Sequence, residues 1–422
     1  KYFLLFGHLP EPITTLEKVF SLDKGSILEV NISTLKFEKY TFSKQYFHYN
    51  ITDEKDAVLK IRETLTNAVQ RHLISDAPIG LFLSGGIDSS ILTILAKQFV
   101  GSNLKTLSIV FDDNKFSEKK YQDIIIKKTG SQHQSYLISQ QNFYDALPDI
   151  LDAMDQPSCD GINTYFISKK SKEFGLKAVL SGLGADELFG GYNSFYRTSV
   201  LEKFKKMPSA LLGVAGLFPD DKRKKISFLA AKSSLGDYLF NRGFYTTKQI
   251  AELLDCSHEE MNELSQNASN LFPEFLDKLD AQEKVSYLET NYYMKNQLLK
   301  DTDYMSMWHS LEVRVPFLDK ELLNLVYSIH PKIRFSNQQI KHLLIKAFET
   351  ELPREIWDRK KNGFVMPFEN WIKNIEPQTN RKELLQKQSN LLNSHKLHWS
   401  RYWSYVLTES NGSKEFINIK NA

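Results

Sequence analysis

The chain has 422 residues, of which 41% are hydrophobic and 25% are charged, and its formal net charge at pH 7 is +3. This composition is ordinary for a globular protein, and the length allows two or three domains with a sizeable core. The small net charge and the dispersed Lys and Arg residues argue against nucleic acid as a partner.

The cysteine content and the apolar segments narrow the class further. Cys159 and Cys256 are too few for a disulfide framework, so we expect a reducing, cytoplasmic environment. Residues 209–218 are apolar but shorter than the ~20 residues of a membrane helix, so a buried helix and no membrane association are predicted. The chain starts at Lys1 without a charged and apolar leader or a Met, which predicts no signal peptide and a missing upstream segment.

The first seventy residues combine a β-rich pattern with a helical one. Residues 1–50 contain aromatic side chains, a bend with several prolines and a short alternating run over residues 26–32. This predicts the end of a β-rich unit that is too small to fold by itself. Residues 52–73 begin with a Thr and acidic residues and continue with apolar side chains at helical spacing, which predicts an amphipathic helix.

Residues 79–98, IGLFLSGGIDSSILTILAKQ, read as a buried strand, a turn of small residues and a helix. Ser89 and Ser90 can act at the helix cap. The amide groups at the helix start, with the backbone left open by two glycines, favour a polyanion. Asp88 would repel an anion unless a metal ion lies between them. The turn therefore predicts a magnesium-bound nucleotide phosphate.

Strand and helix patterns alternate after this turn. Strands are predicted at residues 106–111, 134–138 and 177–180, and helices at residues 117–129 and 162–174. The alternation predicts a doubly wound parallel sheet, with ligands at the carboxyl ends of its strands. Val110 lies at such an end and either lines an adenine pocket or packs in the sheet.

A second motif, residues 181–192 (SGLGADELFGGY), repeats the order of an apolar strand, a Ser-Gly turn and acidic residues. Asp88 and Asp186 follow different strands and can share one Mg²⁺, because magnesium is bound by few protein carboxylates together with substrate phosphates. The alternative for Asp186 is an acid at a helix start. Glu187 fits a structural role as well as a functional one.

The C-terminal half is mostly helical. The Lys and Arg clusters between residues 195 and 282 are interpreted as solvated surface. Residues 283–310 predict a long helix. In LEVRVPFLD, residues 311–319, Glu312 and Arg314 are expected to form a buried structural ion pair, with a catalytic role as the alternative.

Residues 352–371, LPREIWDRKKNGFVMPFENW, place the cations of Lys360 and Lys361 before a turn at Gly363 and Phe364. A lysine on such a loop can follow charge onto a scissile phosphate.

Together, SGGIDSS, SGLGADELFGGY, LEVRVPFLD and LPREIWDRKKNGF resemble the asparagine synthetase family, over about residues 52–371. The resemblance implies an α/β fold with a doubly wound parallel sheet of the ATP-pyrophosphatase type and a large helical C-terminal part. It implies ATP and Mg²⁺ as ligands. Lys361, three residues before Phe364, matches the lysine that steadies the adenylation transition state, whereas Lys360 does not fit that register.

The same resemblance assigns the remaining site residues. ATP contacts are implied for Leu83, Val110, Ser181 and Gly182, pyrophosphate contacts for Ser84, Gly85, Gly86, Ser89 and Ser90, and magnesium ligation for Asp88 and Asp186.

Residues 6–30, FGHLPEPITTLEKVFSLDKGSILEV, resemble the closing segment of the glutaminase domain in this family. The implied domains are a glutaminase remnant at 1–50, a synthetase domain at 51–380 and a helical tail at 381–422. A β-extension of the synthetase domain is the alternative. The family's N-terminal nucleophilic Cys is absent, so the glutaminase centre is expected upstream. A homodimer is possible.

Leu183 departs from the family pattern, which has a Glu after the Ser-Gly of the second motif. The resemblance implies adenylation of a carboxylate, aspartate by family default, and then transfer of ammonia derived from glutamine. Leucine accepts no proton, so the acceptor stays open. A uronic acid or peptide carboxylate, or an ATP-binding protein without enzymatic activity, are the alternatives.

Overall fold

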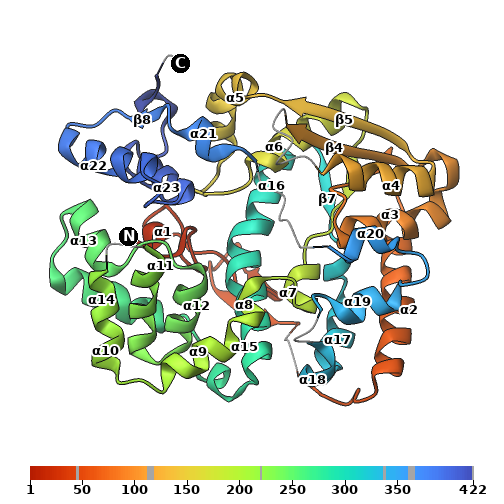
Figure 1. Cartoon of the computed structure of the whole chain (residues 1–422), viewed down its shortest axis with the longest axis horizontal. Helices are drawn as coiled ribbons and strands as arrows, with labels where there is room; N and C mark the ends of the chain where they lie inside the picture. The colour runs from red at the N-terminus through yellow and green to blue at the C-terminus, as the bar shows by residue number, and fades with distance from the viewer. Residues whose placement is uncertain (44–46, 112–117, 219–220, 336–338, 360–365, 421–422) are drawn as a thin grey trace.

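The sheet that organises the fold has five parallel strands in the order β5-β4-β3-β6-β7 and lies in the upper right part of Figure 1. The computed structural model describes residues 1–422 except 44–46, 112–117, 219–220, 336–338, 360–365 and 421–422. The strands are β3 (Ile79–Phe82), β4 (Lys105–Phe111), β5 (Gln132–Ile138), β6 (Ala178–Leu180) and β7 (Glu312–Arg314). The chain runs outward from β3 in one direction and then returns to add β6 and β7 on the other side. This confirms the predicted doubly wound α/β class.

Helices cover both faces of the sheet, which is why its strands are almost uniformly apolar. Leu81 and Leu180 belong to one buried core, which the helices on one face complete. Leu107 and Val179 belong to a second core on the other face. The helices nearest the sheet are α2 (Glu54–His72), α3 (Ile87–Val100), α4 (Lys119–Thr129), α5 (Gln140–Ala153), α6 (Ile162–Glu173) and α16 (Leu299–Met307).

A helical part follows β6 and gathers beside the sheet (Figure 1). It contains α7 (Ala185–Phe189), α8 (Asn193–Tyr196), α9 (Thr198–Lys205), α10 (Ser209–Val214), α11 (Asp221–Lys224), α12 (Ser234–Arg242), α13 (Thr247–Leu254), α14 (His258–Ser269) and α15 (Ala281–Leu288). The predicted long helix consists of α15, a π-helical segment over Glu289–Leu298, and α16. Among the helices of the described residues, none is long and apolar enough to span a bilayer.

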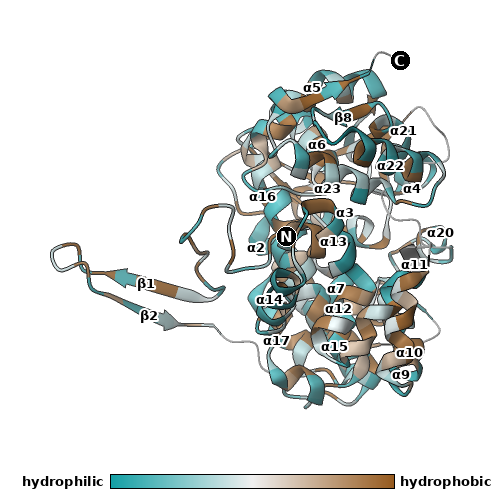
Figure 2. Cartoon of the chain, turned by 90° about the vertical axis from the view of Figure 1, so that its left-hand side faces the viewer, coloured by the Kyte–Doolittle hydropathy of each residue, from teal (hydrophilic) through white to brown (hydrophobic). Residues whose placement is uncertain are grey.

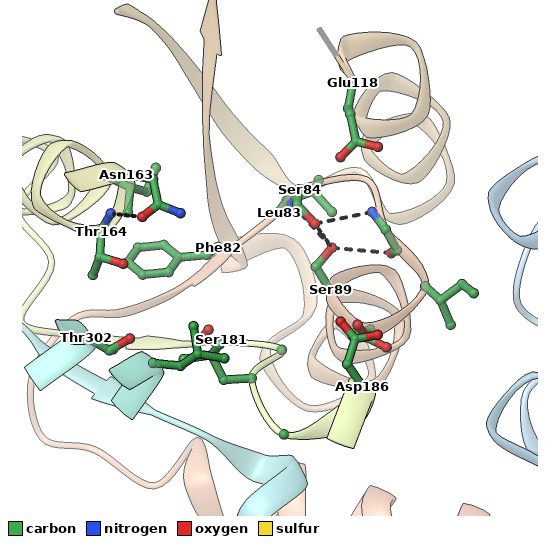
Figure 3. A pocket seen from close by; sticks show the side chains of 18 of the residues that line it. Phe82, Leu83, Ser84, Ser89, Glu118, Asn163, Thr164, Ser181, Asp186 and Thr302 are labelled. Atoms are coloured by element: carbon green, nitrogen blue, oxygen red, sulfur yellow. Dashed lines mark hydrogen bonds between the residues drawn. The ribbon is translucent and has the colours of Figure 1, made fainter. Parts of the chain in front are cut away.

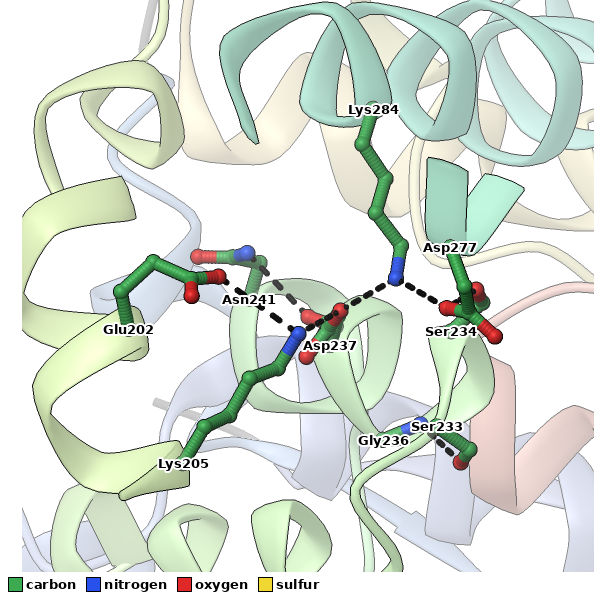
Figure 4. A network of polar contacts seen from close by, with 9 residues as sticks. All are labelled: Glu202, Lys205, Ser233, Ser234, Gly236, Asp237, Asn241, Asp277 and Lys284. Carbon is green, nitrogen blue, oxygen red and sulfur yellow. Dashed lines mark hydrogen bonds and ion pairs between the residues drawn. The ribbon is translucent and has the colours of Figure 1, made fainter. Parts of the chain in front are cut away.

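An ion-pair network ties three of these helices together around the buried carboxylate of Asp237 on α12 (Figure 4). Lys205 on α9 donates to Asp237 at 2.7 Å, and Lys284 on α15 donates to it at 2.8 Å. Lys284 also reaches Asp277 at 2.7 Å. Each charge therefore has a partner of opposite sign, as burial requires.

The C-terminal segment divides between the two cores: its first helices pack into the core that contains Leu81, and its last elements pack into the core that contains the first residues of the chain. Its elements are α17 (Lys320–Ser328), α18 (Pro331–Arg334), α19 (His342–Ala347), α20 (Arg354–Trp357), α21 (Phe368–Ile372), β8 (Ile375–Pro377), α22 (Lys382–Asn393), α23 (Trp399–Glu409) and β9 (Ile417–Ile419). The short helix α1 (Tyr2–Phe6), which the sequence did not reveal, shares a core with α23. The domain boundaries at residues 50 and 380 stay a prediction.

A hairpin of β1 (Ser26–Val30) and β2 (Phe37–Thr41) projects from the body of the molecule (Figure 2). Nearly all of its residues are exposed, including Ile27, Val30 and Phe37. An isolated two-stranded hairpin is marginally stable in water, and exposed apolar side chains of this kind mark interaction surfaces.

The expectation of a buried helix at residues 209–218 was wrong. Leu212 and Ala215 are buried, but Leu211, Val214 and Leu217 are 54%, 55% and 70% exposed. The reason is that α10 lies at the periphery and packs through one narrow stripe. Composition alone cannot reveal which side of an apolar helix faces the protein.

The ion pair of Glu312 and Arg314 exists, but it is not buried as predicted. The two residues lie in β7, an edge strand, where alternate side chains share a face. Arg314 Nε donates to Glu312 Oε1 at 2.9 Å, and the Glu312 side chain is 59% exposed. The guanidinium also donates to the carbonyls of His72 and Ile74, so the arginine ties the edge of the sheet to the end of α2.

Candidate active site

A cavity of about 320 Å³ opens where the carboxyl ends of β3 and β6 lie side by side. Leu81 and Leu180 are paired in these strands, so the turns that follow them start at the same level. In Figure 3, Ser84, Ser89 and Asp186 lie at one end of the cavity, the loop end, and Asn163, Thr164 and Thr302 lie at the other. The reversal of strand order makes this the expected ligand site of a doubly wound sheet.

The turn between β3 and α3 is held in shape by its own hydroxyl groups. Ser84 N donates to Ser89 Oγ at 3.2 Å, and the two hydroxyl oxygens are 3.0 Å apart. Gly85 has φ +84°, a backbone conformation that favours glycine. The cap residue of α3 is Gly86, so the prediction that Ser89 and Ser90 act at the cap was wrong. Ser89 instead fixes the turn from inside the helix.

Asp88 and Asp186 come together through a lysine that the motifs did not reveal. Lys341 Nζ lies 2.7 and 2.6 Å from the two carboxylate oxygens of Asp88 and 2.5 Å from Oδ1 of Asp186. The Lys341 side chain is only 3% exposed. Burial alone would lower the pKa of Lys341, but Asp186 and Asp88 outweigh burial and raise the pKa above its ordinary value. The ammonium is therefore charged.

This arrangement fits a hard divalent cation. Three carboxylate oxygens from the ends of two strands converge on one point, and magnesium takes few protein carboxylates alongside water and phosphate oxygens. Within the ranges that the structure describes, no cluster of three or more His, Cys, Asp or Glu side chains could hold a metal. A metal at Asp88 and Asp186 would thus take its remaining ligands from water or from a substrate.

The two turns approach each other so closely that one of them needs a glycine. A β-carbon added to Gly182 would lie 2.9 Å from Cβ of Asp88. Ser181, which precedes it, lines the cavity, as do Leu83, Ser84, Gly86 and Ser89 among the sequence candidates.

Three sequence candidates stand apart from the cavity. Gly85, Ser90 and Val110 are not among the described residues that line it. Ile109, the neighbour of Val110, does line it, together with Leu107 from the same strand. Their roles at the nucleotide stay predictions.

Arg359 and Glu118 add a second ion pair at the cavity wall, which sequence reasoning missed. Arg359 Nη1 donates to Glu118 Oε1 at 3.0 Å, and Nη2 donates to the carbonyl of Gly85 at 3.0 Å. The guanidinium lies 3.6 Å from the centroid of the Tyr121 ring. Lys360 and Lys361 lie outside the described residues, so the assignment of Lys361 stays a prediction. Arg359, which directly precedes Lys360, ties this part of the chain to the turn between β3 and α3.

Two further carboxylates line the cavity and have no cation. Asp301 is 4% exposed and accepts a hydrogen bond from Ser158 Oγ at 2.6 Å. Asp160 accepts one from the amide of Gly161 at 2.9 Å. Within the part of the chain that the structure describes, neither has an ion-pair partner. Burial and the charge of Asp160 raise the pKa of Asp301, and burial raises the pKa of Asp160.

Leu183 also lines the cavity, so this part of the wall is apolar where the related family has an acid. Glu187 is buried and accepts a hydrogen bond from the hydroxyl of Tyr192 at 2.7 Å. Burial and the charge of Asp186 raise the pKa of Glu187 to about 7.

Comparison with known proteins gives one consistent family. The asparagine synthase family model matches residues 60–405. Asparagine synthetase 1 of Bacillus subtilis, described as glutamine-hydrolyzing, is 33% identical over 383 residues, which are 88% of this chain and 59% of that protein. Asparagine synthetase B of Escherichia coli is 24% identical over 76% of this chain and 47% of its own length. The chain thus spans less than two thirds of these relatives.

Among solved structures the similarity is lower. The NH3-dependent NAD synthetase of Campylobacter jejuni covers 59% of this chain and 96% of its own, with 18% identity and a TM-score of 0.26.

Proposed function

Because the chain belongs to the asparagine synthase family, we propose that it makes an amide by activating a carboxylate with ATP. An oxygen of the acceptor carboxylate attacks the α-phosphate, the bond between the α-phosphate and the bridging oxygen breaks, and pyrophosphate leaves. Ammonia then attacks the acyl carbon and loses a proton, and AMP leaves with the former carboxylate oxygen. The acyl adenylate stays in the cavity between the two steps.

The observation that carries this proposal is the meeting of Asp88, Asp186 and Lys341 beside the phosphate turn. Mg²⁺, when bound, neutralises charge on the leaving pyrophosphate. The two carboxylates would hold it, while Ser84 and Ser89 keep the turn in the shape that leaves room for phosphate. The protein's share of the catalysis is thus alignment and charge stabilisation.

Asp160 and Asp301, which we call the acidic wall of the cavity, support an acceptor that carries an ammonium group beside its reacting carboxylate, as aspartate does. A buried and a half-buried carboxylate without a cationic partner among the described residues are costly, and a positive group on the ligand would compensate them. Asp160 and Asp301 are the two carboxylates, and both line the cavity. A uronic acid offers them no positive charge. We therefore favour aspartate over a sugar acid, even though Leu183 replaces the family's Glu.

We further propose that residues 1–50 belong to a glutaminase domain and that the ammonia comes from glutamine. The support is the β1–β2 hairpin, whose apolar side chains lie exposed as the strands of a larger sheet would if separated from it. Residues 51–380 would then form the synthetase domain, with residues 381–422 as its helical C-terminal segment.

The test measures AMP and pyrophosphate with ATP, Mg²⁺ and ammonium chloride, using aspartate or succinate as acceptor. Succinate is a matched control because it is aspartate without the amino group. We expect AMP and pyrophosphate with aspartate and far less with succinate. Formation of ADP, or no product with any carboxylate, would contradict adenylation, and equal rates with both acids would contradict the assignment of the acidic wall.

A further inference from the structure

The ammonium of Lys341 lies where a metal ion would have to bind. It is within 2.7 Å of three carboxylate oxygens of Asp88 and Asp186. Magnesium binds oxygen at about 2.0–2.1 Å, so an ion shared by these carboxylates would occupy nearly the same point. The two cations exclude each other by size and by charge.

We propose that Lys341 is a placeholder for the metal: it occupies the site between Asp88 and Asp186 in the nucleotide-free protein, so that a divalent cation enters only together with nucleotide phosphates. This inference rests on the proposed function, because it takes Asp88 and Asp186 as the metal ligands. It adds an order of binding that the family assignment does not contain.

The packing around Lys341 shows that this contact is built into the fold. A β-carbon on Gly191 would lie 1.7 Å from Oδ1 of Asp186 and 2.5 Å from Cε of Lys341, so a side chain there is incompatible with the contact. Lys341 itself has φ 50° directly before α19, a left-handed conformation that few residues other than glycine adopt. The space left by Gly191 and the backbone conformation of Lys341 together allow the ammonium to contact both carboxylates.

The balance of charge explains why nucleotide is needed for the exchange. Asp88 and Asp186 with Lys341 carry a net charge of −1, which burial tolerates better than the −2 of the carboxylates alone. Adding a divalent cation while Lys341 stays nearby would give +1. The negative charge of a triphosphate compensates that excess and offers the displaced ammonium new oxygen partners. When pyrophosphate and metal leave, Lys341 can return to the carboxylates.

Manganese is a suitable probe, because free Mn²⁺ is measured directly by electron paramagnetic resonance. We would titrate Mn²⁺ into the wild type, Lys341→Gln and Lys346→Gln, each with and without α,β-methylene ATP. Lys346 is a matched control, since it lies on the same helix and pairs with the exposed Glu54. Lys341→Gln is expected to bind one Mn²⁺ without nucleotide about tenfold more tightly than the other two proteins. With the analogue present, the wild type is expected to bind Mn²⁺ as well.

A second measurement, of thermal stability, tests the proposal even if Lys341→Gln folds poorly. Melting temperatures are taken with and without Mg²⁺ in the absence of nucleotide. Mg²⁺ is expected to raise the melting temperature of Lys341→Gln and to leave that of the wild type unchanged. Tight binding of Mn²⁺ to the nucleotide-free wild type, or a rise in its melting temperature with Mg²⁺ alone, would overturn the proposal.

These outcomes are separable from the proposed function. If the wild type excludes Mn²⁺ without nucleotide and yet makes no AMP with any acceptor, the placeholder stands and the proposed reaction fails. If AMP is formed but the nucleotide-free wild type binds Mn²⁺ tightly, the reaction stands and the placeholder fails.

Discussion

Four aspartates line the cavity in two pairs, and among the described residues only one of these pairs has a cationic partner. Asp88 and Asp186 share the ammonium of Lys341. Within the described ranges, Asp160 accepts a hydrogen bond from an amide and Asp301 accepts one from a hydroxyl group, and neither has an ion-pair partner. In the first group Lys341 compensates one of the two negative charges and leaves a net charge of −1, whereas the second group depends on a proton or on the charge of a ligand. This contrast is the basis of our two proposals, that the first group exchanges its cation with nucleotide and that the second binds a positively charged acceptor.

Removing a carboxylate of the first group should have the largest effect on activity. Asp186→Asn is expected to lower the rate of AMP formation by about 10³-fold or more, because a metal and its phosphate lose a ligand. Asp123→Asn, an exposed acid on α4, is the control. Nearly full activity of Asp186→Asn would remove this residue from the site.

Removing the cation of the first group should chiefly change stability. Lys341→Met leaves two carboxylates without their cation, and the free energy of unfolding is expected to fall by about 3 kcal/mol. Urea denaturation without Mg²⁺ measures it. Asp88→Asn in the same chain should recover part of the loss, because it removes one of the two uncompensated charges. An unchanged midpoint for Lys341→Met would show that the contact contributes nothing.

In the second group, a neutral replacement should change the choice of acceptor. Asp301→Asn is expected to reduce the preference for aspartate over succinate by about tenfold or more, since a charged hydrogen bond to the acceptor is lost. The KM for ATP should stay near that of the wild type. A preference as strong as in the wild type would show that Asp301 does not face the amino group.

The smallest effect concerns the pH dependence of stability. The raised pKa of Asp301 means that this group stabilises the fold below its ordinary pKa range and that this stability is lost as the pH rises through the higher folded value. Asp301→Asn should therefore gain stability relative to the wild type at pH 8 and gain less at pH 4.5, as measured by urea denaturation. A difference that does not vary with pH would contradict this.

Contiguous motifs made the sheet and its two turns predictable. SGGIDSS and SGLGADELFGGY each include the turn residues and an acid, so a single stretch predicts local structure and chemistry together. The end of β3 and that of β6 could be placed because parallel strands align their carboxyl ends. The meeting of Asp88 and Asp186 followed from that alignment.

Isolated residues were not predictable in the same way. Lys341 stands alone before α19, and its importance arises only when the fold brings it to two carboxylates from other segments. Asp160 and Asp301 belong to segments that are far apart in the sequence and that tertiary packing brings together. Their proximity is shown by Gly161, where an added β-carbon would lie 2.9 Å from Cβ of Asp301. For Lys341, the available signal in the sequence was its place directly before an apolar helix. The strand β7 was not predicted, because three residues are too few to show the alternation of a strand.

Isotope transfer tests the central claim, that an acceptor carboxylate attacks the α-phosphate of ATP. Aspartate labelled with ¹⁸O in its side-chain carboxylate is incubated with the protein, ATP, Mg²⁺ and ammonia. The ¹⁸O content of AMP and pyrophosphate is then determined by mass spectrometry. The account predicts one labelled oxygen in each AMP and none in pyrophosphate. Unlabelled AMP, or label in inorganic phosphate with ADP as the other product, would contradict it.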